Sequence, residues 1–541
     1  MKADGSSRRS TAVRGAVLVA IVVTALVGCS PSVPPVGTRF SAATRAWWTY
    51  TRAATYDFMA TDIVVPMRDG TPIGCSLGRP SRDGAPAEGR FPGLIVEFTP
   101  YVLMGEIFNR EARFFGARGY NTLVCTLRGI GRSGGTWQHG MSSQDGRDAH
   151  DLVEWLGVQP FSDGRIGQFG ESYGGQTSYG AAVERPAHLV AVAPMQPPSN
   201  LYDDVIYPGG IKSTEGGLID NWPQFSPLLS AGGVDARAEY AINRAHPTFD
   251  AYWQDRSLVD RYRQIQVPVL TIGGWDDGFF RSGTLAAIER APGRTWAIYG
   301  PWPHLPMVAF DDPCVLCPPD PLPAGVLLAW FDHWIKRLPD ADMIPADPTF
   351  VSYEGPVGVG AGWQELSWDP AGRDVTTFEL GADGRLARRA APGTAVFDEP
   401  KEPSDPRGSV TFTTDELVGD RVLEGHASLE LRASLSASDA NLYVEVVDVD
   451  VDGHETVVND GFLLASHRSS HIDPTPVPPG RFLDYTIPVR ADDYRFASGH
   501  RLRVRISGGS SNALNPPTLP VVVTISTGPR SKLSMPGFAR S

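Results

Sequence analysis

A serine between two glycines, Ser172, has the surroundings of a catalytic nucleophile. It lies in Gly170-Glu171-Ser172-Tyr173-Gly174, directly behind residues 165–169, a segment that can enter a strand. In a G-x-S-x-G turn from strand to helix, a side chain at either glycine would meet neighbouring backbone, and the serine hydroxyl is held exposed. The pentapeptide by itself arises by chance in many proteins. Acyl transfer through Ser172 is a first hypothesis that needs partners elsewhere in the chain.

Two later segments place an acid and a histidine just past expected strands. Residues 267–272 are apolar and β-branched and lead to Asp277, and residues 295–299 form another short apolar run before His304. Loops at the carboxyl ends of parallel strands are where an open sheet gathers its chemistry. Singly, Asp277 is equally well explained as a turn former and His304 as a polar loop residue. The chain order serine, aspartate, histidine is that of α/β-hydrolases, and the three together favour a catalytic triad.

Several further motifs, in register with the pentapeptide, resemble one family of serine hydrolases. They include Met67-Arg68-Asp69-Gly70, residues 127–135 and residues 159–167. From about residue 56 to about residue 526, the chain resembles the family of cocaine esterase, X-prolyl dipeptidyl peptidases, glutaryl acylases and α-amino acid ester hydrolases. The resemblance implies Ser172 as nucleophile, His304 as general base and then acid, and Asp277 as the group that orients the imidazole. A triad of this kind requires no metal or organic cofactor.

The resemblance also implies an oxyanion hole. An apolar strand, residues 94–98, runs into Pro100-Tyr101, and the cocaine esterase branch has a tyrosine hydroxyl directed at the oxyanion at this place. Tyr101 would donate from its side chain and Tyr173 from its backbone N–H. The alternative for Tyr101 is an ordinary interfacial aromatic.

The residues after Asp277 bear on the class of substrate. Family members that hydrolyse α-amino acid esters hold the substrate ammonium with carboxylates, two of them shortly after the catalytic acid, but Gly278, Phe279 and Phe280 stand here. A buried ammonium without a carboxylate is costly, so an uncharged ester is the expected substrate. Two acids in the insertion, Asp203 and Asp204, remain candidates for amine binding.

An apolar substrate pocket is expected beside the triad. Residues 274–279 resemble the segment of cocaine esterase whose phenylalanine lines an apolar acyl pocket. Phe279 is the expected pocket wall here. Trp275 is a second candidate, although a position in the protein core is the preferred interpretation of this tryptophan.

The N-terminus predicts export. Four basic residues within the first fourteen precede an apolar run, residues 16–27, which is too short to span a bilayer comfortably and matches a signal-peptide core. Leu26-Val27-Gly28-Cys29 resembles the lipobox of bacterial lipoproteins, in which cleavage precedes a cysteine that carries acyl chains. We expect a signal peptide over residues 1–28, lipidation of Cys29, and a tether over residues 29–55 that anchors the enzyme to the outer face of the cell membrane. Ordinary secretion and an uncleaved membrane anchor are the alternatives.

Composition excludes some functions and leaves the cysteines open. The 541 residues carry a net charge of -13, and no basic patch follows the signal region, which argues against nucleic-acid binding. Cys314 and Cys317 lie in a Pro-rich loop without a second pair to complete a zinc site, so a small local disulfide is expected. Cys75 and Cys125 fall in neighbouring strands of the implied fold. They could pair or remain buried thiols, and thiols are slightly preferred.

The sequence predicts an α/β class protein of two domains. Residues 56–345 are expected to form a doubly wound α/β-hydrolase sheet, and residues 198–266, where the strand pattern stops, a helical cap insertion that decides specificity. Residues 346–541 contain alternating polar and apolar segments, for example residues 428–433, 441–446 and 501–506, and predict an antiparallel β-sandwich, which the resemblance implies is a jelly roll. Residues 448–453 resemble the start of an EF-hand, but a hairpin with an Asp-Gly turn is the preferred interpretation.

These observations favour a serine carboxylic ester hydrolase acting on a small molecule through an acyl-enzyme. Three alternatives remain: an X-prolyl dipeptidyl peptidase or an amide or β-lactam acylase with the same triad, an acyltransferase, and a non-catalytic binding protein that kept the fold. Amides and esters share the tetrahedral intermediate, so the triad does not separate the first alternative. The natural substrate and the oligomeric state are not determined by the sequence.

Overall fold

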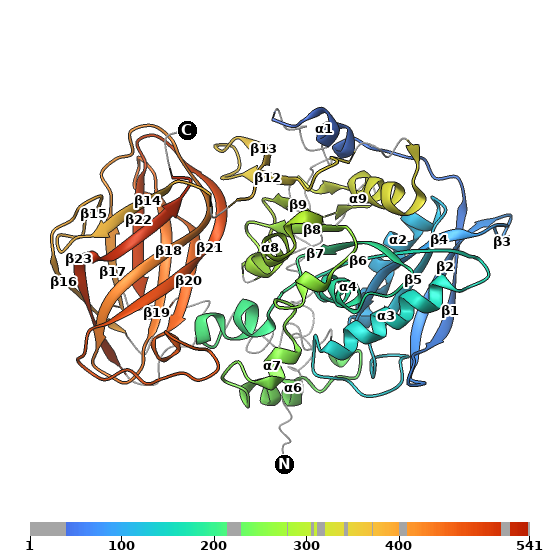
Figure 1. Cartoon of the computed structure of the whole chain (residues 1–541), viewed down its shortest axis with the longest axis horizontal. Helices are drawn as coiled ribbons and strands as arrows, with labels where there is room; N and C mark the ends of the chain where they lie inside the picture. Colours follow the sequence, from blue (N-terminus) through green and yellow to red (C-terminus); the bar gives the residue numbers. More distant parts are fainter. Residues whose placement is uncertain are drawn as a thin grey trace, which may run out of the picture.

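The structure is a computed structural model that describes residues 39–213, 229–278, 280–304, 308–310, 320–339, 344–369, 372–399, 408–509 and 520–538. A helix-covered sheet and an all-β domain lie side by side, and helices α6 (Ala236–Arg244) and α7 (Ala251–Asp255) lie together at the lower edge of the view in Figure 1. The predicted fold class, an α/β-hydrolase sheet with a helical insertion and a C-terminal antiparallel β domain, is confirmed.

The first sheet has the order β1-β2-β5-β4-β6-β7-β8-β9-β12-β13, with β3 paired to β2. Neighbours from β5 to β12 pair in parallel, whereas β1, β2 and β13 pair antiparallel at the edges. β8 and β9 are buried along their whole length, as expected for a parallel sheet covered on both faces. The strands are β1 (Asp57–Pro66), β2 (Pro72–Arg82), β3 (Ala85–Pro86), β4 (Phe91–Thr99), β5 (Asn121–Thr126), β6 (Ser162–Glu171), β7 (Leu189–Met195), β8 (Val269–Gly274), β9 (Thr295–Gly300), β12 (Phe350–Glu354) and β13 (Gly362–Leu366).

Helices cover both faces of this sheet and give it two apolar cores. Leu152 of α3 and Tyr179 of α4 belong to one core, and Trp47 of α1, Phe115 of α2 and Trp330 of α9 belong to the other. The helices are α1 (Ala42–Trp48), α2 (Gly105–Gly116), α3 (Ser143–Gly157), α4 (Tyr173–Glu184), α8 (Phe280–Arg290) and α9 (Ala324–Phe331), with short 3-10 or π turns at Val102–Met104, Pro292–Arg294 and Asp332–Lys336 and a small pair of strands, β10 (Val308–Ala309) and β11 (Leu322–Pro323).

The strand order contains a topological switch point at β4. The chain leaves β4 through α2 to reach β5 on one side, and returns through α3 to β6 on the other side. Ligands of open α/β sheets bind at the carboxyl ends of the strands beside such a point. Tyr101 follows β4 and Ser172 follows β6, so both residues stand at the switch.

Residues 198–266 form short helices where they are described. Besides α6 and α7 they contain turns of π or 3-10 helix at Tyr202–Ile206, Pro208–Gly210 and Tyr262–Gln264. Asp235 and Asp250 begin α6 and α7, because their side chains accept backbone N–H groups of the first turn. Three aromatic residues form the buried centre of this insertion: Tyr202, Trp253 and Tyr262.

The C-terminal domain is one antiparallel sheet around a separate apolar core. The segments predicted from alternation, residues 428–433, 441–446 and 501–506, lie within β18, β19 and β22. The strands are β14 (Val375–Leu380), β15 (Leu386–Ala387), β16 (Gly393–Glu399), β17 (Ser409–Thr413), β18 (Arg421–Leu435), β19 (Asn441–Val449), β20 (Glu455–Leu464), β21 (Leu483–Phe496), β22 (Arg501–Ser507) and β23 (Val521–Pro536), with a 3-10 turn at Ala465–His467.

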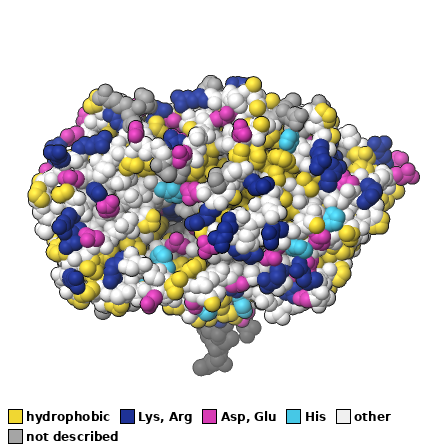
Figure 2. Space-filling model, viewed as in Figure 1, with side chains coloured by type: hydrophobic (Ala, Val, Ile, Leu, Met, Phe, Trp, Pro, Cys, Tyr) yellow, Lys and Arg dark blue, Asp and Glu magenta, His cyan; other side chains and the backbone are white. Residues whose placement is uncertain are grey.

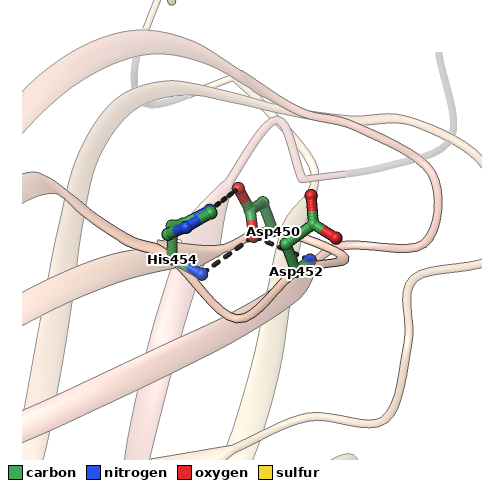
Figure 3. A group of neighbouring side chains, drawn as sticks. All are labelled: Asp450, Asp452 and His454. Atoms are coloured by element: carbon green, nitrogen blue, oxygen red, sulfur yellow. Dashed lines mark hydrogen bonds and ion pairs between the residues drawn. The ribbon is translucent and has the colours of Figure 1, made fainter.

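The Asp-rich segment after β19 is a hairpin turn, as preferred from the sequence. β19 and β20 pair antiparallel on either side of it. The Asp450 carboxylate accepts the backbone N–H groups of Asp452 and His454 and contacts the His454 ring nitrogen Nδ1 at 3.0 Å (Figure 3). Side-chain-to-backbone bonds of this kind stabilise a tight turn by themselves, and strands rather than the helices of an EF-hand flank it.

Two predicted boundaries differ from the structure. Residues 29–55 are predicted as a tether, but residues 42–48 form α1, whose Trp47 and Trp48 are buried in the core of the first domain. The β domain is predicted from residue 346, but β12 and β13 belong to the first sheet, because β12 pairs with β9. Polar–apolar alternation predicts a strand but does not predict the sheet to which the strand belongs, so the predicted domain boundary lies too early in the chain.

The preference for free thiols at Cys75 and Cys125 is wrong. The two residues are direct partners across β2 and β5, and their sulfur atoms form a disulfide. Four other residues of the sequence predictions, Cys29, Phe279, Cys314 and Cys317, lie outside the described residues. Among the helices that the described ranges contain, none has the length and apolar character needed to cross a membrane.

Candidate active site

Ser172 occupies a strained turn between β6 and α4. Its backbone has φ 58° and ψ −110°, a left-handed conformation that costs a residue with a Cβ of order 1–3 kcal/mol and is found mainly at functional sites. The amide of Ser172 donates to the carbonyl of Met195 at 2.8 Å, which ties the turn to the next strand. A Cβ at Gly170 would lie 2.7 Å from the backbone of Gly174, so the turn closes only with glycine there.

The structure brings Ser172, Asp277 and His304 together from three strand ends. Nε2 of His304 lies 2.9 Å from Oγ of Ser172, and Nδ1 of the same ring lies 2.9 Å from Oδ1 of Asp277. Asp277 follows β8 and His304 follows β9, so parallel neighbours in the sheet deliver both side chains to the turn after β6. This chain of hydrogen bonds can move a proton from the serine to the imidazole.

The surroundings of the imidazole favour its charged form. Asp277 is 1% exposed, and burial raises the pKa of its carboxyl, while the His304 and Arg281 charges oppose the rise. Burial lowers the pKa of His304, but the charge and hydrogen bond of Asp277 outweigh this and leave it above its ordinary value. Phe280 stacks on the imidazole with ring centroids 4.0 Å apart, which holds the ring in its plane.

The two predicted oxyanion donors lie on either side of the serine. The Tyr101 hydroxyl is a neighbour of the Ser172 side chain, and burial keeps the pKa of this phenol above its ordinary value, so it remains a donor. Tyr173 is the first residue of α4, where a backbone N–H has no intrahelical acceptor. The Tyr173 side chain is engaged elsewhere: its hydroxyl donates to Asp145 at 2.7 Å and accepts the Met141 amide.

An apolar pocket opens beside these donors, beneath the cap. Tyr101 and Tyr173 form its inner wall, and Glu239 of α6 is its one acidic lining residue among those described. The Glu239 carboxylate accepts from Trp137 and contacts the His139 ring, both at 3.0 Å, so the cap helix is bonded to the loop that edges the pocket. The other lining residues are Trp137, His139, Gly140, Met141, Leu201, Ile206, Leu229 and Asn243.

Trp275 takes the core position that the sequence favoured over a place in the pocket wall, and it is not among the residues that line the apolar pocket. Its ring is 4% exposed and packs in a core cluster with Tyr299, Phe350 and Trp368, and its indole N–H donates to Ser352 at 3.1 Å. Trp275 directly follows the last residue of β8, Gly274, and its side chain packs in the core there.

The two acids weighed for amine binding are structural. Asp204 accepts the backbone N–H groups of Ser199 and Asn200 at 2.7 and 2.8 Å, and burial raises its pKa to about 7. Asp203 accepts the amide of Gly209 at 2.9 Å and is exposed. Neither lines the apolar pocket.

Sequence reasoning missed three side chains close to the triad: Phe280, Glu97 and Glu171. The only sequence signal for Phe280 is its position three residues after Asp277. The signal for Glu97 is a charged residue inside the apolar strand β4, since glutamate is rarely buried without a specific partner. Burial raises the pKa of Glu171 to about 7, and the charge of His304 opposes this rise, so the carboxyl of Glu171 interacts electrostatically with the imidazole.

Comparison with known proteins agrees with this geometry. Residues 69–306 match the family model of the X-Pro dipeptidyl-peptidase (S15 family), and residues 345–531 match that of the X-Pro dipeptidyl-peptidase C-terminal non-catalytic domain. The chain belongs to the cocaine esterase and X-prolyl dipeptidyl peptidase family of serine hydrolases. The first model covers the strand ends that carry the triad, and the second covers nearly all of the β domain.

Individual members of the family resemble the chain over most of its length. It is 26% identical to the cocaine esterase of Rhodococcus sp. (strain MB1 Bresler) over 84% of this chain and 91% of that protein. A CocE/NonD family hydrolase from Staphylococcus aureus has the same fold, with a TM-score of 0.73 at 20% identity, covering 90% of this chain and 98% of the other. An α-amino acid ester hydrolase gives a TM-score of 0.72 at 17% identity, covering 94% and 100%.

The surface in view carries charges of both signs. Figure 2 shows acidic and basic side chains interspersed over this face of the molecule.

Proposed function

We propose that this serine hydrolase is an esterase that cleaves uncharged carboxylic esters through an acyl-enzyme on Ser172. The observation that carries the proposal is the continuous contact of Ser172, His304 and Asp277, at 2.9 Å for each link, beside an apolar pocket. A strained serine, a base in reach and a buried acid behind the base together make a hydroxyl into a nucleophile.

In the first half-reaction, Ser172 attacks the ester carbonyl while His304 takes its proton. Asp277 holds the imidazole in the tautomer that presents Nε2 to the serine, and its charge stabilises the imidazolium that forms. The Tyr101 hydroxyl and the Tyr173 N–H donate to the oxyanion, and each donor of this kind contributes roughly 3 kcal/mol. As the tetrahedral intermediate collapses, the ester C–O bond breaks, the imidazolium protonates the leaving oxygen, and the alcohol departs.

In the second half-reaction, water takes the place of the alcohol. His304 removes a proton from the water as it attacks the acyl carbon, and the same two donors stabilise the second oxyanion. The imidazolium returns the proton to Ser172, and the carboxylic acid departs.

The pocket supports an uncharged acyl or alcohol group as the substrate part it holds. Aromatic and aliphatic residues, among them Tyr101, Trp137 and Met141, line it, and its one acid among the described residues, Glu239, is bonded to two neighbours through one of its oxygens. A similar enzyme is named cocaine esterase for an ester substrate, which agrees with this class. Desolvating a charged group in such a pocket is costly.

Peptidase activity is the second candidate, because the family model takes its name from X-Pro dipeptidyl-peptidase. The test compares p-nitrophenyl acetate and butyrate with dipeptidyl-proline p-nitroanilides, using wild type and Ser172→Ala. We expect ester turnover that disappears in the variant, with labelling of Ser172 by a fluorophosphonate probe. Hydrolysis of anilides only would make the protein a peptidase, and activity retained by a clean Ser172→Ala preparation would reject the triad. Added alcohols that give transfer products would identify an acyltransferase.

We also propose that the enzyme is exported and anchored through lipid on Cys29. The support is the basic and apolar N-terminal segment that ends in Leu26-Val27-Gly28-Cys29, and two or more acyl chains anchor a protein stably. Expression of the full chain in a bacterial host with a radiolabelled fatty acid should label the wild type but not Cys29→Ala. An unlabelled, freely secreted wild type would support the secretion alternative.

A further inference from the structure

A buried acid, Glu97, lies directly beneath the turn that carries the serine. Glu97 is 1% exposed, and its Oε1 accepts the backbone N–H of Glu171 at 2.8 Å. Glu171 immediately precedes Ser172, so the bond reaches the peptide to which the nucleophile is attached. A carboxyl group is seldom buried this completely without a specific partner, and this partner is the catalytic turn.

The glycines of the turn leave the space that this carboxyl group fills. A Cβ at Gly174 would overlap Oε2 of Glu97, and a Cβ at Gly170 would come within 2.9 Å of the same atom. The pentapeptide therefore needs glycine at two places partly because Glu97 packs between them. The Glu97 side chain and the glycines of the turn are sterically complementary.

A bulge in β4 directs Glu97 to this place. Pairing with β5 runs from Ile95–Leu123 directly to Glu97–Val124, so Val96 is the additional residue. Bulges re-aim side chains and are frequent beside active sites. Four residues later the same strand end delivers Tyr101, the proposed oxyanion donor.

The titratable groups that face Glu97 are acids and a phenol. Glu111 of α2 and Glu171 of β6 are the neighbouring acids, and the Glu97 charge acts on Tyr101. Among the described residues, its second oxygen, Oε2, has no hydrogen-bond partner. Burial, with the charges of Glu111 and Glu171, raises the pKa of Glu97 well above its ordinary value. This environment favours the neutral form of the carboxyl group over the charged form.

We propose that Glu97 in its acid form is a positioning residue, which holds the Glu171–Ser172 peptide and keeps negative charge away from the oxyanion. The proposal rests on the proposed function of Ser172. Through Oε1 the acid fixes the peptide whose turn aims the serine hydroxyl. Ionised Glu97 would instead place a like charge beside Tyr101, where the oxyanion develops, and oppose the transition state.

The test uses Glu97→Gln, Glu97→Leu and a control, Glu106→Gln. Glutamine keeps the shape and the acceptor oxygen and cannot ionise, whereas leucine removes the acceptor. Glu106 is an exposed acid at the start of α2. Initial rates with p-nitrophenyl butyrate are measured from pH 6 to about pH 10, with the Ser172→Ala blank subtracted.

We expect wild type and Glu106→Gln to lose kcat on the alkaline side. Glu97→Gln should keep kcat near pH 7 within about threefold and lack the alkaline decline. Glu97→Leu should lower kcat by roughly 10- to 100-fold with little change in KM, as for the loss of a buried hydrogen bond to one partner.

An alkaline limb in Glu97→Gln identical to that of wild type overturns the proposal, whether or not the leucine variant folds. A Glu97→Leu variant with wild-type kcat and profile does the same. Loss of all turnover in Ser172→Ala alongside either result would leave the proposed function standing, whereas activity in Ser172→Ala rejects that function itself.

Discussion

Arg281 of α8 and Asp492 of β21 form a buried ion pair that joins the two domains. Their Nη1 and Oδ2 atoms are 2.7 Å apart, and each side chain is 7% exposed. Arg281 also donates to the Ala491 carbonyl at 3.2 Å. Figure 1 shows α8 on the side of the sheet domain that faces the β domain. Since Phe280 begins α8 and stacks on His304, the β domain braces the helix next to the triad.

Breaking this pair should destabilise the protein. Asp492→Leu leaves a buried, uncompensated guanidinium, and we expect a loss of about 3–5 kcal/mol in the free energy of unfolding, measured by urea denaturation. The double variant Arg281→Met with Asp492→Leu should recover much of that loss. The exposed pair of Arg385 and Asp415 is the control, and Asp415→Asn should change stability by less than about 1 kcal/mol. If Asp492→Leu and Asp415→Asn lowered the free energy of unfolding equally, the bracing role of the buried pair would be contradicted.

Removal of the Tyr101 hydroxyl should destabilise the transition state without affecting substrate binding in the ground state. Tyr101→Phe keeps the ring that packs edge-on against Tyr173 and removes one oxyanion donor. We expect kcat for p-nitrophenyl butyrate to fall by about 10²–10³-fold with little change in KM. Tyr353→Phe, on β12, is the matched control and should be neutral. A rise in KM with unchanged kcat would instead assign Tyr101 to substrate binding.

The acid limb of the pH–rate profile should report His304. The pKa of His304 lies above its ordinary value because Asp277 stabilises the charged form, and only the neutral imidazole can act as a base. Therefore kcat/KM should fall as pH drops through that raised pKa. In Asp277→Asn the limb should move to lower pH and kcat should fall by roughly 10⁴-fold. Asp276→Asn changes the exposed neighbour of Asp277, and an equal effect there would contradict the assignment.

Stability should decrease as pH rises through the neutral range. Burial raises the pKa of Asp145, Asp204 and Asp493 to about 7. An acid whose pKa is higher in the folded state stabilises the fold fully below its unfolded pKa, near 4, and this contribution is lost as pH approaches 7. We expect Tm to decline between about pH 5 and 8. Asp145→Asn should reduce the dependence of Tm on pH. A Tm that rises between about pH 5 and 8 would contradict the raised pKa values of these three acids.

The disulfide of Cys75 and Cys125 should stabilise the sheet edge. The bridge spans a sequence separation of 50 residues, and closing a loop of that size contributes roughly 2–4 kcal/mol. A Cys75→Ala, Cys125→Ala variant should unfold at lower guanidinium concentration than the oxidised wild type. Its midpoint should match that of the reduced wild type, and a wild-type midpoint unaffected by reductant would argue against the bridge.

Local patterns were sufficient for the outline of this protein. The glycines around Ser172, the apolar runs before Asp277 and His304, and the alternation after about residue 347 predicted the fold class and the order of the site residues. Such signals work because strand–turn–helix geometry and two-residue periodicity depend on nearby residues. They failed for β12, because its pattern is compatible with a strand of either domain.

The sequence by itself determined which side chains can do the chemistry and in what order they occur. Only the tertiary structure decided the contacts that depend on strand order: the disulfide of Cys75 and Cys125, the approach of His304 to Ser172, and Glu97 beneath the catalytic turn. Glu97 and Glu171 are 74 residues apart, and their contact arises from a bulge and a crossover. Pairing across such separations is set by the packing of the whole sheet, which no local window of sequence contains.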